Sequence, residues 1–134
     1  SGTTHGPISS VEWLETLLIY ATVTLQIPPE KIVLGLPLYG YNWDVSGSSR
    51  TTAVTWEQVE KIKNDNPDYV DNIDEASKEN NLEYRSRSIW YQNSTTINYR
   101  VELAQKYKIK GVIFWRLEGE DPQIWQLPSL STQY

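Results

Sequence analysis

The chain has 134 residues, a net charge of -5, one His and neither Cys nor Met, which excludes a disulfide framework, a thiolate metal site and a cysteine nucleophile. A negatively charged chain without a basic cluster binds nucleic acid poorly. No apolar run approaches the roughly 18 residues of a membrane span. We therefore expect no nucleic acid, membrane, metal or cofactor. Because there is no initiator Met, we expect a processed product or an excised piece.

The first predicted elements are a loop, a helix and a strand. Residues 9–12 form a capping pattern of Ser followed by Glu, which predicts a helix start. One apolar face follows, and Pro28 and Pro29 end the helix; the face contains Leu14, Leu18, Ala21 and Leu25. Residues 31–38 are apolar without alternation, which is typical of a strand buried on both faces. A loop is expected to begin at residues 41–43.

The middle of the chain predicts a small α+β section. Thr55 is expected to cap a short helix that ends near residues 64–67, after a polar loop over 44–55. Residues 68–80 are acidic and read as irregular, with a turn at Asn80 and Asn81. Two short antiparallel strands are predicted over 82–87 and 89–92.

The last part of the chain repeats the helix-then-strand order. Ser94 is expected to cap a helix with Ile97 and Val101 on its buried face and a Glu102–Lys106 ion pair on the other. An apolar strand over 111–115 and a helical turn over 122–127 follow. Two helix-and-strand units around an insertion predict an α/β fold.

The sequence after each buried strand is rich in aromatic side chains. Residues 39–43 read Tyr-Gly-Tyr-Asn-Trp, and residues 115–118 read Trp-Arg-Leu-Glu. In barrels of alternating strands and helices, chemistry lies at the carboxyl ends of the strands. The excess of Trp and Tyr over Phe suits a surface that both stacks on a ligand and hydrogen-bonds to it.

Three ordered blocks resemble the family-18 glycoside hydrolases, which include chitinases and bacterial spore-cortex N-acetylglucosaminidases. The blocks are residues 31–43, 89–91 and 111–121. The sequence of the third block resembles the bacterial spore and cell-wall subgroup more than the animal chitinases. The resemblance implies the C-terminal portion of a (β/α)8 TIM barrel: strands 7 and 8 with their helices over 1–47 and 89–134, and the α+β insertion over 48–88. It also implies a polymer of β-1,4-linked N-acetylglucosamine, chitin or spore peptidoglycan, and a bacterial spore, cell-wall or secreted location.

The family's acidic signature, Asp-x-x-Asp-x-Asp-x-Glu, is absent from these residues. Its final Glu is the general acid in a substrate-assisted, retaining mechanism, in which the substrate's N-acetyl oxygen attacks the anomeric carbon. We therefore expect no catalytic residue in this chain, with the acid upstream, and no hydrolase activity from the chain alone.

The resemblance assigns substrate-binding roles to six residues. Trp115 would be the floor of the cleavage subsite, Tyr39 would line the cleft, and Tyr41 stands where many chitinases have Arg. The full set is Trp115, Tyr39, Tyr41, Asn42, Trp43 and Trp90. The alternative for each is packing in the core, and packing is what we expect of Trp13, Trp56 and Trp125. His5 is expected on the surface, and a solvated loop is expected to hold Glu118, Glu120 and Asp121.

Two other functions compete with a hydrolase fragment. The chain could be a non-catalytic carbohydrate-binding module, because an aromatic floor without an acid suits binding alone. It could also be a self-associating structural fragment, because strands 31–38 and 111–115 would present unpaired edges and form a homo-oligomer through them.

Overall fold

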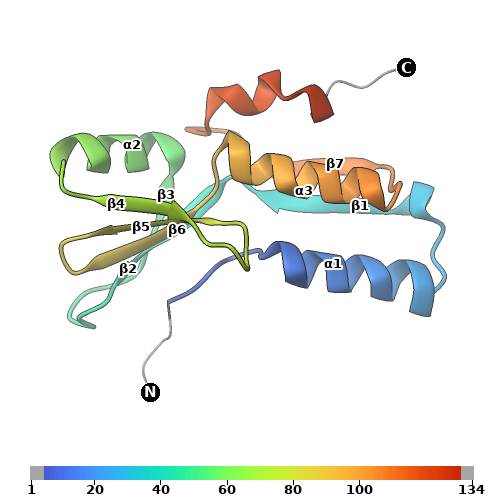
Figure 1. The fold of residues 1–134 in the computed structure, drawn as a ribbon, viewed down its shortest axis with the longest axis horizontal. Coiled ribbons are helices and arrows are strands. Elements are labelled where there is room, and N and C mark those ends of the chain that lie inside the picture. The colour runs from blue at the N-terminus through green and yellow to red at the C-terminus, as the bar shows by residue number, and fades with distance from the viewer. Residues whose placement is uncertain (1–4, 131–134) are drawn as a thin grey trace.

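The computed structural model describes residues 5–130, which form two sheets that lie end to end (Figure 1). A parallel pair contains β1 (Val33–Pro37) and β7 (Gly111–Trp115). The second sheet has five antiparallel strands in the order β3-β2-β6-β5-β4. The chain passes from one sheet to the other through Leu38, because β2 (Tyr39–Asp44) begins directly after β1. The predicted α/β character is confirmed, and the antiparallel sheet is larger than the sequence indicated.

Helix α1 (Val11–Ile19) continues as a π-helical turn over Tyr20–Thr24, and a 3-10 turn at Pro29–Lys31 precedes β1. The predicted helix is therefore present. Its cap is Ser10, whose hydroxyl accepts from the Trp13 backbone N–H at 3.1 Å. Leu14 and Leu18 are buried as expected. Leu25 is 52% exposed, so its predicted place on the buried face is wrong, since the π turn shifts the helical register.

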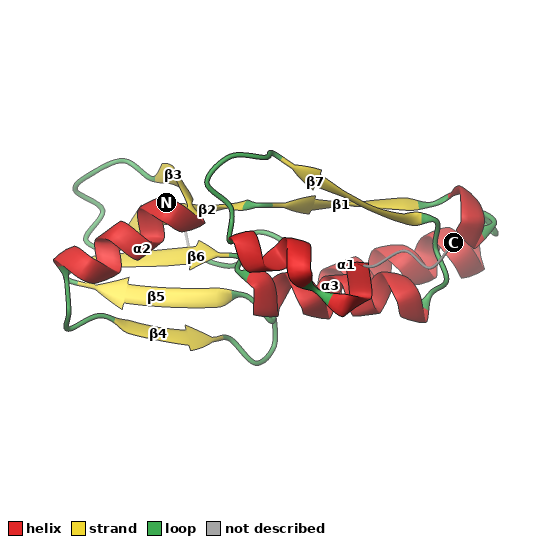
Figure 2. Cartoon of the chain, turned by 90° about the horizontal axis from the view of Figure 1, so that it is seen from above, coloured by secondary structure: helices red, strands yellow, loops and turns green. Residues whose placement is uncertain are grey.

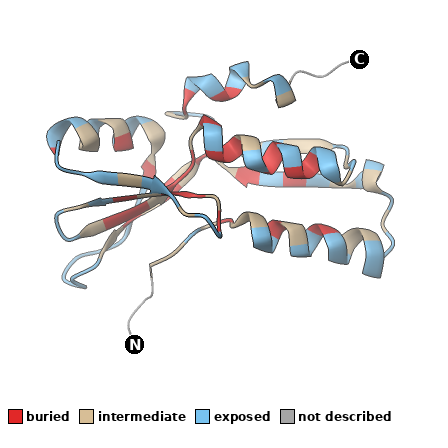
Figure 3. Cartoon of the chain, in the orientation of Figure 1, coloured by how far each residue is buried: buried red, intermediate tan, exposed pale blue. Residues whose placement is uncertain are grey.

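Helices α1 and α3 cover one face of the parallel pair (Figure 2). The core between them contains Leu14, Leu18, Leu34, Leu36, Leu38, Ile97, Val101, Leu103 and Ile124. The opposite face is open: Val33 is 44% exposed and Ile113 is 61% exposed. Buried and exposed residues alternate along β1 (Figure 3). The expectation that both strands are buried on both faces is thus wrong here, because no second layer lies over that face among the described residues (Figure 2).

The five-stranded sheet has its own core. It comprises β2, β3 (Thr52–Thr55), β4 (Val70–Ile73), β5 (Asn80–Tyr84) and β6 (Arg87–Tyr91). Helix α2 (Trp56–Asp65) begins with the predicted Thr55 cap and covers one face of the sheet, where Val54, Val59, Leu82, Ile89 and Tyr91 are buried. Trp56 packs against this cluster, as expected.

Several local expectations in this sheet are wrong. Residues 41–43 lie within β2 rather than a loop, and the stretch read as irregular contains β4. Asn80 and Asn81 start a strand instead of making a turn; the turn lies at Arg85, whose φ is +50°. The Asn80 side chain accepts from the Thr96 hydroxyl at 3.0 Å. This tertiary partner satisfies an amide that local propensity would place in a turn.

Helix α3 (Ser94–Lys106) is present where predicted, with Ile97 and Val101 buried. Its cap is Asn93 rather than Ser94, in a reciprocal capping box with Thr96. The predicted Glu102–Lys106 pair does not form. The Lys106 ammonium instead lies 2.6 Å from Glu15 of α1, because the two helices pack side by side.

The chain ends in 3-10 turns at Pro122–Gln126 and Pro128–Leu130, near the predicted helical turn. Trp13 is 54% exposed and Trp125 is 49% exposed, so the packing role expected of both is at most partial. Trp125 does contact Phe114 edge-to-face, with ring centroids 5.5 Å apart. None of the helices described between residues 5 and 130 is long and apolar enough to cross a membrane.

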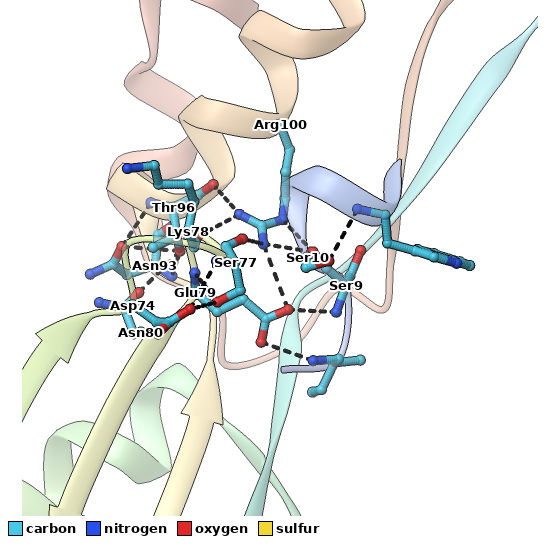
Figure 4. A network of polar contacts seen from close by, with 12 residues as sticks. Ser9, Ser10, Asp74, Ser77, Lys78, Glu79, Asn80, Asn93, Thr96 and Arg100 are labelled. Carbon is cyan, nitrogen blue, oxygen red and sulfur yellow. Dashed lines mark hydrogen bonds and ion pairs between the residues drawn. The ribbon is translucent and has the colours of Figure 1, made fainter. Parts of the chain in front are cut away.

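A buried polar network joins the N-terminal segment, the β4–β5 connection and α3 (Figure 4). Glu79 accepts from the backbone N–H groups of Ile8 and Ser9, and Arg100 donates to the Ser9, Ser77, Lys78 and Thr96 carbonyls. The two side chains are fully buried, with Arg100 Nη2 and Glu79 Oε1 3.6 Å apart. Burial raises the pKa of Glu79 and lowers the pKa of Arg100 to about 10, against their mutual attraction.

Candidate functional site

Strand β2 carries a row of aromatic rings on one face of the antiparallel sheet. Tyr39, Tyr41 and Trp43 alternate along the strand and therefore point to the same side. Their rings meet edge-on, with centroids 5.7 Å apart for the first pair and 6.2 Å for the second. Trp90 is paired with Tyr41 in the β2–β6 register, which places it on the same face. This is the face opposite α2.

Trp115 ends β7 beside the start of this row. Its backbone carbonyl accepts from the Leu38 N–H at 2.7 Å, which holds the end of β7 against the start of β2. The side chain is 69% exposed, and its peptide bond to Arg116 is cis. A cavity of about 500 Å³ lies here, lined by Leu38, Tyr39, Tyr41, Ala53, Val54, Thr55, Gln58, Trp115, Arg116 and Glu118.

The structure brings three of the six predicted residues, Tyr39, Tyr41 and Trp115, into this cavity. Trp43 and Trp90 share the aromatic face but lie outside the cavity lining. The Trp90 indole N–H donates to His5 Nδ1 at 3.5 Å, so the single His is a partly buried neighbour of the aromatic row rather than a free surface residue.

Asn42 lies on the other face of β2, toward α2. It is 6% exposed, donates to the Tyr84 hydroxyl at 2.8 Å and accepts from Arg87 Nε at 2.6 Å. These side-chain hydrogen bonds are with β5 and β6, and Asn42 is not among the residues that line the cavity. Residues 39–43 form a strand, and side-chain alternation along a strand places Asn42 on the face opposite Tyr41 and Trp43.

No motif in the sequence predicts the polar part of the cavity wall. Thr55 ends β3 and caps α2, Gln58 lies in the first turn of α2, and Arg116 and Glu118 follow β7. Thr55 and Gln58 lie far from β7 in sequence. The β2–β3 pairing and the hydrogen bond from the Glu57 N–H to the Gly119 carbonyl bring them to the cavity. Glu118 is exposed as expected. Asp121, predicted in the same solvated loop, is 5% exposed and accepts from the Ser94 N–H at 2.8 Å.

The Tyr39 hydroxyl is a polar group on the cavity wall. Burial, aided by the neighbouring Tyr41, raises the pKa of the Tyr39 hydroxyl, which therefore stays a neutral donor. Next to the cavity, the Glu118 N–H lowers the pKa of the Glu120 carboxyl. Among residues 5–130, no group of three or more His, Asp or Glu side chains could hold a metal ion. The arrangement can stack on and hydrogen-bond to a polar ring.

The alignments with curated relatives include nearly all of this chain, but they span only about a third of the length of each relative. The uncharacterized glycosylase YvbX of Bacillus subtilis is 28% identical over 125 residues, 90% of this chain and 36% of its own length. A cortical fragment-lytic enzyme of B. subtilis is 27% identical over 143 residues, 99% of this chain and 32% of its own. A class V chitinase of Medicago truncatula is 27% identical, covering 97% and 37%.

Solved structures show the same fold. The spore cortex-lytic enzyme SleL of Bacillus cereus superposes with a TM-score of 0.82 at 22% identity, covering 93% of this chain and 30% of that one. A chitinase of Chromobacterium violaceum gives 0.82 at 23% identity, covering 96% and 41%. The model of the glycosyl hydrolases family 18 matches residues 4–121. The chain therefore belongs to glycosyl hydrolase family 18.

Proposed function

We propose that the chain forms part of the glycan-binding cleft of a hydrolase that acts on polymers of β-1,4-linked N-acetylglucosamine. The observation that carries this proposal is the convergence of Tyr39, Tyr41 and Trp115 on one cavity. An acetamido sugar offers an apolar ring face to Trp115 and polar groups to the Tyr hydroxyls. Trp43 and Trp90 extend the aromatic face beyond the cavity and would contact neighbouring sugars.

The placement of β1 and β7 as strands 7 and 8 of a TIM barrel is part of this proposal. Their parallel pairing, with α3 between them in sequence, supports it. The partial coverage of the longer relatives supports it as well. On this placement, the open face of the pair, with Val33 and Ile113, lines the barrel interior.

The 134-residue chain is proposed to bind glycan without cleaving it. The acidic run that supplies the family's general acid is absent from the sequence, and the described acids beside the cavity, Glu118 and Glu120, lie in one exposed loop. A non-catalytic binding role thus describes the chain alone, whereas hydrolysis describes a protein that also contains the acid.

Titration of the tryptophan fluorescence with N-acetylglucosamine oligomers tests this function, because Trp115 lies in the cavity. We expect saturable quenching, and no product from chitin oligomers or spore peptidoglycan under the same conditions. Absence of quenching at millimolar oligomer would refute the binding cleft. Release of reducing sugar by the pure chain would refute the proposed lack of catalysis.

A further inference from the structure

The cavity wall contains one cation and one anion. Of the described residues that line it, Arg116 is the only base and Glu118 the only acid. Arg116 Nη2 lies 3.3 Å from Glu118 Oε2, and the two side chains are 70% and 77% exposed. An exposed ion pair of this kind is weak, because water screens the charges and both side chains lose rotamer freedom. A ligand anion can therefore replace Glu118 as the partner of the guanidinium.

The loop that presents Arg116 is held on both sides. The Gly119 carbonyl accepts from the Glu57 N–H at 3.0 Å, at the start of α2. A Cβ at Gly119, where φ is +70°, would approach the Thr55 hydroxyl to 2.8 Å, so the loop lies directly against this helix start. Asp121 anchors the other end on α3. The backbone position of Arg116 beside Trp115 is thereby set before any ligand binds.

A guanidinium binds a carboxylate through two parallel N–H···O bonds, a geometry that neutral sugar hydroxyls do not match. The two candidate polymers differ in this one group. Chitin is a neutral homopolymer, whereas in peptidoglycan alternate sugars carry a lactyl ether that ends in a carboxylate. A charged donor in the cavity wall therefore distinguishes between them.

We propose that Arg116 is a specificity-determining residue that binds a carboxylate on the sugar next to the one stacked on Trp115, so that the cleft prefers the acidic peptidoglycan glycan to chitin. This inference rests on the proposed glycan-binding function. In the free protein the Arg116 guanidinium donates to the Glu118 carboxylate. This hydrogen bond breaks when the ligand carboxylate binds to Arg116.

The test compares two glycans that differ only in whether their lactyl carboxyl groups are free or methyl-esterified. The first is a peptide-free tetrasaccharide of alternating N-acetylglucosamine and N-acetylmuramic acid, and the second is its methyl ester. Calorimetry with the 134-residue chain should show about tenfold tighter binding of the free acid. In Arg116→Gln this ratio should fall to about one, and in Glu118→Gln it should rise. Arg50→Gln, an exposed arginine outside the cavity, removes the same charge and should keep the wild-type ratio.

The outcomes distinguish the role of Arg116 from glycan binding by the chain as a whole. Equal binding of acid and ester by the wild-type chain would overturn the role of Arg116 and leave glycan binding intact. An Arg116→Gln variant that weakens both glycans equally would assign the residue to packing and overturn the inference. No binding of either glycan, or of N-acetylglucosamine tetramer, would overturn the proposed function and the inference together.

Discussion

Trp115 is a large aromatic side chain that contributes little to the fold, because it is 69% exposed. Its contact surface is available to a ligand, and Tyr39 lies in the same cavity. Burial of an aromatic side chain by a ligand is worth on the order of 2 kcal/mol. A substitution of Trp115 should therefore weaken ligand binding more than it lowers the stability of the fold.

We expect Trp115→Ala to weaken binding of N-acetylglucosamine tetramer by at least about tenfold, or about 1.4 kcal/mol. The free energy of unfolding should change by about 0.5 kcal/mol or less, as is usual for an exposed position. Calorimetric titration and urea unfolding measure the two quantities. Trp125→Phe, at a half-exposed indole outside the cavity, should alter neither by much. Unchanged affinity in Trp115→Ala would remove this residue from the cleft.

Glu79 is the opposite case, a charged residue whose contacts are all internal. It accepts from two backbone N–H groups and faces Arg100, and both side chains are fully buried. Glu79→Gln replaces one acceptor by an amide donor and leaves Arg100 without a counter-charge. We expect a loss of about 3–5 kcal/mol of unfolding free energy in urea titrations.

Two comparisons define this effect. Glu83→Gln, at an exposed position on β5, should change the stability by about 0.5 kcal/mol or less. Glu79→Gln combined with Arg100→Met should recover part of the loss, because the unpaired charge is then gone. A Glu79→Gln protein as stable as the wild type would show that the network is not what holds the N-terminal segment to α3.

At the scale of elements, the close approach of β2 and β6 depends on Gly40. A Cβ at this position would lie 2.2 Å from the Trp90 carbonyl oxygen and 2.6 Å from the Tyr91 Cβ. We expect Gly40→Ala to force the strands apart and cost about 1–3 kcal/mol, the usual cost of overpacking. Chemical unfolding measures it, and Gly111→Ala, where a Cβ meets nothing within 4 Å, is the matched control. Equal stability of the two variants would contradict the observed strand contact.

The connection between β4 and β5 should contribute to the acid sensitivity of the fold. The Ser77 hydroxyl and N–H lower the pKa of Asp74 below its usual 3.8. A lowered folded-state pKa gives stability that is present above the unfolded pKa and lost as the pH falls through the folded pKa. Burial raises the pKa of Glu79, so the contribution of that residue is lost as the pH rises instead.

We therefore expect Asp74→Asn to flatten the loss of unfolding free energy between about pH 5 and pH 2, measured by urea unfolding at each pH. Ser77→Ala removes the hydroxyl donor and keeps the backbone one, so it should flatten the curve less. If wild type and Asp74→Asn lose the same unfolding free energy between about pH 5 and pH 2, Asp74 does not contribute to the acid sensitivity of the fold.

At the scale of the whole molecule, the parallel pair has an apolar face without a covering layer among residues 5–130. Val33, Ile113 and Trp115 are exposed on it, and both strands have an unpaired edge. Such a surface favours association, so we expect the chain to form concentration-dependent oligomers in light scattering.

The double substitution Val33→Lys and Ile113→Lys should keep the chain monomeric at concentrations where the wild type associates. Two added charges on this face repel a second copy and disfavour edge pairing. Val23→Lys alters an equally apolar position, 67% exposed, on the π turn after α1 and should leave association unchanged. A wild-type chain that is monomeric at high concentration would contradict the role of the open face.

The sequence determined the parts of this protein that depend on local pattern. Apolar periodicity predicts α1 and α3, and unbroken apolar runs predict β1 and β7. These predictions succeed because backbone geometry and burial act within a few residues. The ordered blocks likewise identified the family, because similar residues at similar spacing persist in relatives of the same fold. The resemblance to this family also predicts that Trp115 and Tyr39 contact the sugar, and this assignment stays a prediction.

Only the tertiary structure decided which side chains meet. The register of β2 against β3 and β6 placed Tyr41 in the cavity and turned Asn42 to the opposite face, since neighbouring residues on a strand point to opposite sides. Lys106 forms an ion pair with Glu15, and Asn80 accepts a hydrogen bond from Thr96. Both partners are too far apart in sequence for a local pattern to predict the contact. Arg116 and Gln58 share a cavity for the same reason: pairing between distant strands, not proximity in sequence, determines the composition of the site.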